Sequence, residues 1–191
     1  DNQLKHISRI SSTLDIQLLE KYDLTDGFLG WRYSYTSLFN LAQSLCKTSD
    51  IVFLRDHHRS HSDIIEFSNN EFYNAKLRIA TKYNKLKSIK NEPAVRWINI
   101  TGEVTSPPTG SSKNAKEAQA IIYELRRIVR NNYQGSIGVV TPFREQKKLI
   151  NDMVNADTTL RESLFAREFL ADVVHSFQGD ERDIIIFSPV F

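Results

Sequence analysis

A glycine followed by two acids forms the first candidate ligand site, in the segment DVVHSFQGDERDIIIFS at residues 172–188. Gly179 allows the backbone to approach a ligand closely, and Asp180 and Glu181 follow it directly. The apolar run at 184–187 is typical of a buried strand. Loops beside such strands are where open α/β sheets hold ligands, so the segment predicts a binding loop. The alternative is a turn with a solvated run of charges.

A second candidate is the segment SIGVVTPFREQKKLI at residues 136–150, where an apolar run leads into an amphipathic stretch. Pro142 suits the start of a helix, where free backbone N–H groups and the positive end of the helix dipole bind phosphate. Thr141 adds a hydroxyl group and Arg144 adds a guanidinium group. The alternative is that Thr141 only caps the helix and that Arg144 is a solvated surface charge.

A third candidate is the segment FLRDHHRSHSDIIEFSNNEFY at residues 53–73, which contains three histidines within five residues. We expect no metal site there, because the adjacent His57 and His58 point apart in an extended segment and Asp56 is the only near carboxylate. Arg59 is more informative, since its planar guanidinium suits the charge of a transferring phosphoryl group. Alternatively, Arg59 pairs with a neighbouring aspartate as a structural clamp.

Apolar periodicity predicts the elements that must position these residues. The expected strands are 51–56, 94–100, 136–142 and 184–187, and the expected helices are 62–73 with Ser62 as its cap, 114–133 and the stretch after Pro142. Strands that alternate with helices predict the α/β class, a parallel sheet flanked by helices. The run at 184–187 is expected to be a central strand covered on both faces.

Composition limits the possible functions. The chain has 191 residues, of which 40% are hydrophobic and 25% charged, as in one soluble domain with or without an appendage. With a net charge of only +2, a polyanion would need a local groove. The single Cys46 excludes an internal disulfide and a cysteine-based zinc site. The sequence contains no apolar run of membrane-spanning length and no signal peptide, so we expect a cytoplasmic, intracellular protein without a membrane partner.

Together the three segments resemble the superfamily 1 helicases, in the branch that includes the nonsense-mediated-decay RNA helicase. Residues 172–188 resemble motif V, residues 136–150 resemble the element TP(Y/F)xxQ, and residues 53–73 resemble the pattern R-S/M-H followed by F-x-N-x-x-F-Y. The three segments occur in the family's order. The resemblance implies a RecA-like fold, which is the P-loop NTPase fold, here without the P-loop, because no glycine-rich loop ends in Gly-Lys-Ser/Thr.

The resemblance also implies roles for individual residues. Arg59 would be the arginine finger that reaches the γ-phosphate, and His58 would stack on adenine where tyrosine is usual. Gly179 and Glu181 would bind the nucleotide, with the glutamate bonded to the ribose. The residues that match the nucleic-acid groove of the family are Thr141, Arg144, His175 and Ser176.

The opening residues DNQL resemble the end of motif III, which closes the first motor domain, so Gln3 would sense the γ-phosphate. We therefore expect residues 1–50 to be a helical connector from the first motor domain. Residues 51–191 would be the second RecA-like domain, cut off at its C-terminal end. The cofactors would be ATP and Mg²⁺, both of which need the absent first motor domain. The partners would be that domain and single-stranded DNA or RNA.

The expected function is the C-terminal motor domain of an ATP-dependent superfamily 1 DNA or RNA helicase. The full-length protein would hydrolyse ATP, and this chain alone would be inactive. Two alternatives stay open. One is a non-catalytic nucleic-acid-binding module of helicase-like fold, and the other is a small metal-dependent nuclease or phosphatase-like enzyme that uses Asp180, Glu181 and Asp183.

Overall fold

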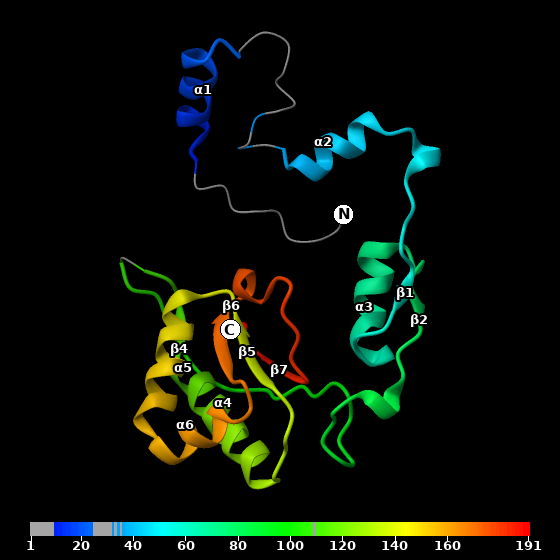
Figure 1. Cartoon of the computed structure of the whole chain (residues 1–191). Helices are drawn as coiled ribbons and strands as arrows, with labels where there is room; N and C mark the ends of the chain where they lie inside the picture. The colour runs from blue at the N-terminus through cyan, green and yellow to red at the C-terminus, as the bar shows by residue number, and fades with distance from the viewer. Residues whose placement is uncertain (1–9, 25–31, 33, 35, 109) are drawn as a thin grey trace. The chain divides into compact units, whose positions relative to one another are not determined.

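The computed structural model describes residues 10–24, 32, 34, 36–108 and 110–191, and it divides into two compact units, Asp1–Asp56 and His57–Phe191. The described part of the first unit contains α1 (Ser12–Lys21), α2 (Leu38–Leu45) and the short 3-10 helix η2 (Thr48–Asp50) (Figure 1). Both α-helices begin after a serine, Ser11 or Ser37, whose side chain accepts a first-turn backbone N–H. The role of this unit as a connector stays a prediction.

The strand expected at 51–56 is absent, because β1 consists of Asp56–His57 only. Residues 51–55 form neither helix nor strand, and Leu54 is 92% exposed. An apolar run becomes a strand when neighbouring strands and side chains cover it. Here the apolar side chains stay exposed, so this prediction was wrong.

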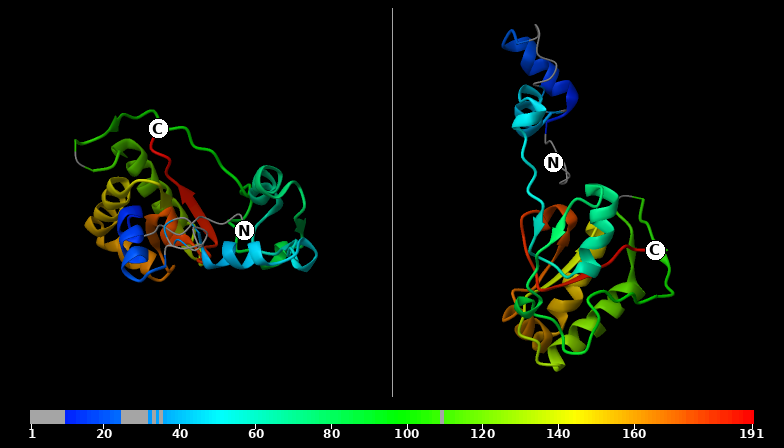
Figure 2. Two further views of the ribbon diagram at one scale, coloured as in Figure 1. Left: turned by 90° about the horizontal axis from the view of Figure 1, so that it is seen from above. Right: turned by 90° about the vertical axis from the view of Figure 1, so that its right-hand side faces the viewer.

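Three parallel strands form the main sheet of the second unit, in the order β6-β5-β7. These strands are β5 (Ile137–Thr141), β6 (Leu170–Val173) and β7 (Ile184–Phe187). The parallel sheet with flanking helices confirms the predicted RecA-like α/β class (Figure 1). The central strand is β5, whereas β7 lies at an edge (Figure 2). The prediction that 184–187 is central and covered on both faces was wrong, because Ile185 and Phe187 are exposed.

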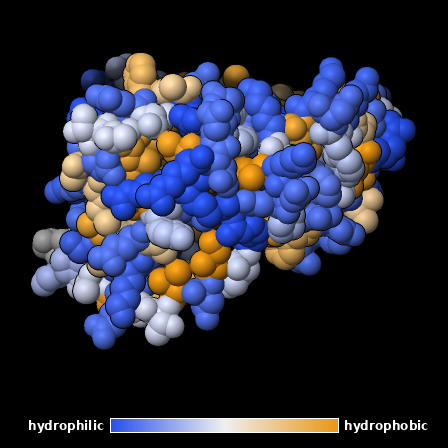
Figure 3. All heavy atoms as spheres, turned by 90° about the horizontal axis from the view of Figure 1, so that it is seen from below, coloured by the Kyte–Doolittle hydropathy of each residue, from blue (hydrophilic) through white to orange (hydrophobic). Residues whose placement is uncertain are grey.

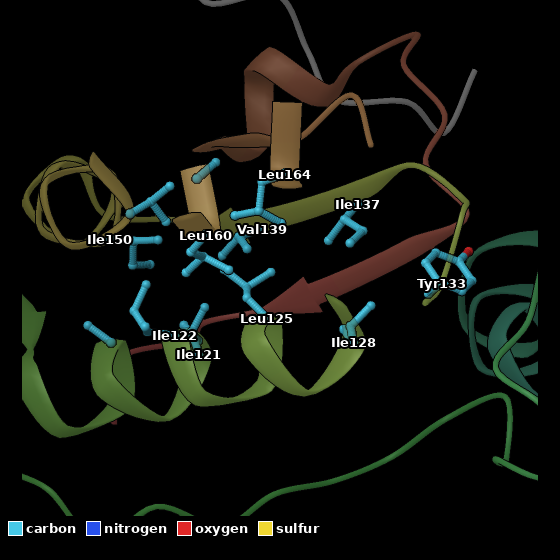
Figure 4. Packing of buried hydrophobic residues seen from close by; sticks show 13 residues of the cluster. Ile121, Ile122, Leu125, Ile128, Tyr133, Ile137, Val139, Ile150, Leu160 and Leu164 are labelled. Carbon is cyan, nitrogen blue, oxygen red and sulfur yellow. The ribbon is translucent and has the colours of Figure 1, made fainter. Parts of the chain in front are cut away.

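Helix α4 (Ala115–Arg130) supplies a large part of the core because its apolar residues recur at helical spacing. Residues of α5 (Arg144–Ala156), α6 (Thr158–Phe165) and β5 complete the same cluster (Figure 4). The buried members are Ala118, Ile121, Ile122, Leu125, Ile128, Tyr133, Ile137, Val139, Ile150, Val154, Leu160, Leu164 and Ala171. This packing fixes β5 and therefore the loops that leave its ends.

The segment between β1 and α4 contains one longer element, α3 (Ser62–Tyr73), and several short ones. The short elements are β2 (Arg78–Ile79), η3 (Tyr83–Lys85), β3 (Val104–Thr105) and β4 (Lys113–Asn114), and β3 pairs antiparallel with β4. The strand expected at 94–100 is absent. Trp97 is 80% exposed and its neighbour Ile98 is also exposed, so neither side of the segment is buried and the alternation gave a wrong prediction.

Hydrophilic residues dominate the face shown in Figure 3, with apolar residues scattered among them. Scattered exposed apolar side chains are normal in proteins. No helix among the described residues is long and apolar enough to cross a membrane.

Truncation of Leu125 to alanine should lower the free energy of unfolding of the second unit by about 2–5 kcal/mol, because it leaves a cavity in a fully buried site. Denaturant titration followed by circular dichroism measures this change. Phe165→Ala is the control in the same unit, since it shortens an apolar side chain that is 88% exposed and should change the unfolding free energy by less than about 0.5 kcal/mol. Equal losses in the two variants would contradict the described core.

Candidate nucleotide and nucleic-acid site

The turn that carries Arg59 connects β1 to α3, and histidines lie on both sides of it. His61 is the N-cap of α3, because its Nδ1 accepts the backbone N–H of Asp63 at 3.3 Å. Ser62, the expected cap, is instead the first residue of the helix. On the other side, the ring of His57 is hydrogen bonded within the same turn. Arg59 is therefore presented by a short turn that is fixed at both ends.

The loop around Gly179 follows the 3-10 helix η4 (Val174–Phe177). Gly179 has a φ of +83°, a backbone conformation that other residues rarely adopt. The carboxylate of Asp180 forms hydrogen bonds inside the loop. It accepts one from the guanidinium of Arg182 at 2.7 Å and one from the backbone N–H of Glu181 at 2.8 Å. The side chain of Glu181 is mostly exposed, so its carboxylate is open to a ligand.

Asp183 closes the same loop onto the start of β5. Burial alone would raise the pKa of Asp183, but hydrogen bonds from the backbone N–H and the hydroxyl of Ser136, at 2.7 and 2.9 Å, hold the pKa below its usual value. The ammonium of Lys87 lies 3.5 Å from the same carboxylate. Asp183 is thus a structural anion that positions the loop.

The structure brings Arg59 and Glu181 together, although they are far apart in the sequence. Nε of Arg59 lies 2.5 Å from Oε1 of Glu181, and the two side chains are 65% and 64% exposed. Water screens such a pair, so it contributes about 1 kcal/mol or less to stability. The site therefore combines an accessible guanidinium, which suits phosphate, with an accessible carboxylate, which accepts hydrogen bonds from hydroxyl groups.

Thr141 was predicted to contact nucleic acid, but the structure places it fully buried. Its hydroxyl accepts the backbone N–H of Phe143 at 3.3 Å and so stabilises the turn before α5. Helix α5 begins at Arg144, and Pro142 lies outside it. The side chain of Thr141 therefore offers no surface to a nucleic-acid strand.

The other three residues predicted to contact nucleic acid follow neighbouring strand ends. Thr141 ends β5, Val173 ends β6, and the two are partners in the register of the sheet. Arg144 lies just after β5, and His175 and Ser176 lie just after β6. All three residues are exposed. The carboxyl edge of a parallel sheet is where α/β proteins bind ligands.

Asp172 lies at this edge and is neutralised there. Burial alone would raise the pKa of Asp172, but hydrogen bonds from Lys147, at 2.7 Å, and from Ser176 help to hold the pKa below its usual value. The acid is thus paired with a cation, which reduces its repulsion of a polyanion at the same edge.

The remaining predicted residues are less constrained. His58 is exposed next to Arg59 in the sequence. Gln3 lies outside the described residues. Among the residues that the structure describes, no group of three or more His, Cys, Asp or Glu side chains could hold a metal ion.

A family model described as an AAA domain, AAA_12, matches residues 34–191. The chain belongs to this family. It is 27% identical, over 97% of its length, to the "Uncharacterized ATP-dependent helicase MG140" of Mycoplasma genitalium, of which it covers 16%. It is 30% identical to the "Regulator of nonsense transcripts 1 homolog" of Neurospora crassa, over 72% of the chain and 13% of that relative.

A third relative is "Helicase sen1" of Schizosaccharomyces pombe, 26% identical over 75% of the chain and 9% of its own length. The chain thus spans less than a fifth of each of these helicases. The family match and the relatives confirm the resemblance to superfamily 1 helicases of the nonsense-mediated-decay branch.

In this helicase domain, the glutamine of the TPFREQ element has a structural role that the sequence did not indicate. Gln146 is fully buried, and its Oε1 accepts the backbone N–H of Asn114 at 2.9 Å. Its Nε2 donates to the carbonyl of Asn114 at 3.2 Å and to Oγ of Ser188 at 3.1 Å. The side chain therefore joins α5 to β4 and to the residue that follows β7. Complete burial of an amide requires such partners.

Replacement of Gln146 by alanine should lower the free energy of unfolding by about 1–3 kcal/mol, because buried donors and acceptors lose their partner. Gln119→Ala is the matched control on the exposed side of α4 and should have almost no effect. Thermal or denaturant unfolding of the two variants compares them. Unchanged stability of the Gln146 variant would contradict the described network.

Proposed function

We propose that the chain acts as the second RecA-like motor domain of an ATP-dependent superfamily 1 helicase. It would supply the arginine finger and part of the groove for single-stranded DNA or RNA. The observation that supports this proposal best is the contact between Arg59 and Glu181, at 2.5 Å. Two residues that the family resemblance assigns to one nucleotide lie side by side on separate loops, and both are accessible.

The residues of the proposed site suit the groups of a nucleotide. The guanidinium of Arg59 would neutralise charge on the γ-phosphoryl group as it is transferred. The carboxylate of Glu181 would accept hydrogen bonds from the ribose hydroxyls, and the ring of His58 would stack on adenine. Entry of the nucleotide would separate the ion pair, which is possible at little cost because the pair is exposed.

The described residues contain no group of three or more His, Cys, Asp or Glu side chains that could hold a metal ion, and Mg²⁺ at a nucleotide is bound largely by phosphates, water and one or two carboxylates. When bound, this ion neutralises phosphate charge, and we assign its ligands and the phosphate-binding loop to another domain of the helicase. The residues of this chain would then position the nucleotide and stabilise charge, which are the main requirements of phosphoryl transfer.

The proposed nucleic-acid contacts are Arg144, His175 and Ser176. Arg144 can form charge-assisted hydrogen bonds to a backbone phosphate from the first turn of α5, where the helix dipole adds a favourable potential. His175 and Ser176 follow the neighbouring strand end. Thr141 would act only by holding the turn before α5. We further propose that the helicase works inside the cell.

Two other functions receive less support. A metal-dependent nuclease would need free carboxylates, but Asp180 is bound to Arg182 and Asp183 is bound to Ser136 and Lys87. A non-catalytic nucleic-acid-binding module would share the fold and the groove. An intact phosphate-binding loop elsewhere in the helicase would favour the motor over that module.

Substitution of Arg59 by alanine in the full-length helicase should lower kcat for ATP by about 10³-fold or more, because a finger acts on the transition state. Affinity for ATP should change by no more than a few fold, as measured by binding of a fluorescent nucleotide. Arg161→Ala, on the exposed side of α6, is the control and should leave both values unchanged. An unchanged kcat in the Arg59 variant would contradict the finger.

The 191-residue chain alone should show no ATPase activity and only weak nucleotide affinity, because its sequence contains no phosphate-binding loop. A coupled phosphate-release assay with and without single-stranded DNA and RNA measures the activity. Turnover that co-purifies with the chain through several columns and persists in a second preparation would contradict the proposed division of the site.

A further inference from the structure

The turn around Arg59 folds onto the ring of His57. Nε2 of His57 lies 3.1 Å from the backbone N of Ser60 and 2.7 Å from its Oγ. The Ser60 N–H is a donor, so it requires an acceptor at Nε2. The ring must therefore be neutral, with its proton on Nδ1. A neutral imidazole thus closes the turn whose tip is Arg59.

A second set of hydrogen bonds fixes this turn to the segment after β2. The carbonyl oxygen of His57 accepts the backbone N–H of Ala80 at 2.8 Å. Thr81 Oγ1 is placed to donate to the carbonyls of His57 and Ser60, at 3.3 and 2.8 Å. The residues on both sides of Arg59 are therefore held by the same neighbouring segment.

The side chain of Arg59 itself has little to hold it. It is 65% exposed and meets Glu181, which is also exposed. A nucleotide that takes the place of this weak contact leaves the direction of the guanidinium to be set by the backbone of the turn. The hydrogen bonds of His57 are the ones that close this turn directly around Arg59.

We propose that His57, in its neutral form, is a positioning residue for Arg59, because its Nε2 holds the turn that directs the guanidinium to the nucleotide. The inference rests on the proposed function of Arg59 as a finger. It assigns a role to a residue that the sequence indicated only as one of several neighbouring histidines.

A consequence is that the turn depends on pH. Protonation of Nε2 would place one N–H against the Ser60 N–H, so the fold disfavours the charged ring. Burial lowers the pKa of His57, and the positive charges of Arg59 and His58 lower it further. Other ionisable groups around the turn are Asp56, His61 and Asp63 in its own segment, Arg78 on the paired strand β2, Tyr83 stacked on His61, and Glu181 opposite Arg59.

The linkage between proton binding and folding gives the direction in which the stability of the turn changes with pH. A histidine whose pKa in the folded protein lies below its ordinary value of 6.5 binds fewer protons in the folded state. Its contribution to the turn is complete above pH 6.5 and is lost as the pH falls through the folded-state pKa. ATP hydrolysis that depends on the turn should therefore also decrease as the pH falls.

The test uses the full-length helicase with His57→Ala, His57→Gln and Arg59→Ala. His57→Ala should lower kcat by about 10-fold or more with a change in the KM for ATP of no more than about threefold, because misplacement acts on the transition state. Glutamine places a non-titrating oxygen near the position of Nε2, so His57→Gln should recover most of the lost kcat. It should also lose the decrease in kcat below pH 6.5 that His57 gives the wild type.

A second measurement does not depend on catalysis. In the 191-residue chain, nitrogen chemical shifts of the His57 ring should identify an unprotonated Nε2 at pH 7.5 and a proton on Nδ1. Ser60→Ala, but not the control Ser88→Ala, should alter these shifts. A charged ring, or a proton on Nε2, would overturn the inference even if His57→Ala failed to fold.

The outcomes separate this inference from the proposed function. Loss of kcat in Arg59→Ala with normal kcat in His57→Ala would overturn the positioning role alone. Normal kcat in both variants would overturn the finger and the positioning role together. A decrease in kcat below pH 6.5 that persists unchanged in His57→Gln would overturn the pH dependence.

Discussion

The parallel pairing of β5 with both of its neighbours is the constraint on which the rest of the structure depends. Parallel strands run in one direction, so the loops after β5 and β6 leave the sheet at the same edge. Burial of β5 beneath α4, α5 and α6 holds that edge in place (Figure 4). The sheet therefore brings together the start of α5 and η4, which the sequence separates.

Polar groups in the second unit divide into those that hold the fold and those that are open to ligands. Gln146 and Asp183 are engaged by several hydrogen bonds, and a change at either would disturb the packing around it. Arg59 and Glu181 share one exposed contact, which a ligand can replace. This difference in hydrogen bonding is the physical reason to assign a structural role to Gln146 and Asp183 and to propose chemistry at Arg59 and Glu181.

The sequence predicted the elements whose pattern is local. Helix α4 and strand β5 lie where periodicity placed them, because their own residues make up much of the core. The predictions of strands at 51–56 and 94–100 were wrong, because the burial of an apolar run depends on distant parts of the chain. The same holds for the site, where the burial of Thr141 could not be seen in the sequence. The family resemblance assigned Arg59 and Glu181 to one nucleotide, but the sequence did not predict the direct contact between the two side chains.

Arg59 and Glu181 are proposed to act on different parts of one nucleotide. The most direct test compares kcat/KM for ATP with kcat/KM for 2′,3′-dideoxy-ATP in the full-length helicase and in the two alanine variants. A site built to bond the ribose hydroxyls discriminates against the analogue that lacks them. We expect Glu181→Ala to lose this discrimination, and Arg59→Ala to keep it while losing kcat for both nucleotides. Unchanged discrimination in Glu181→Ala would contradict the assignment of Glu181 to the ribose.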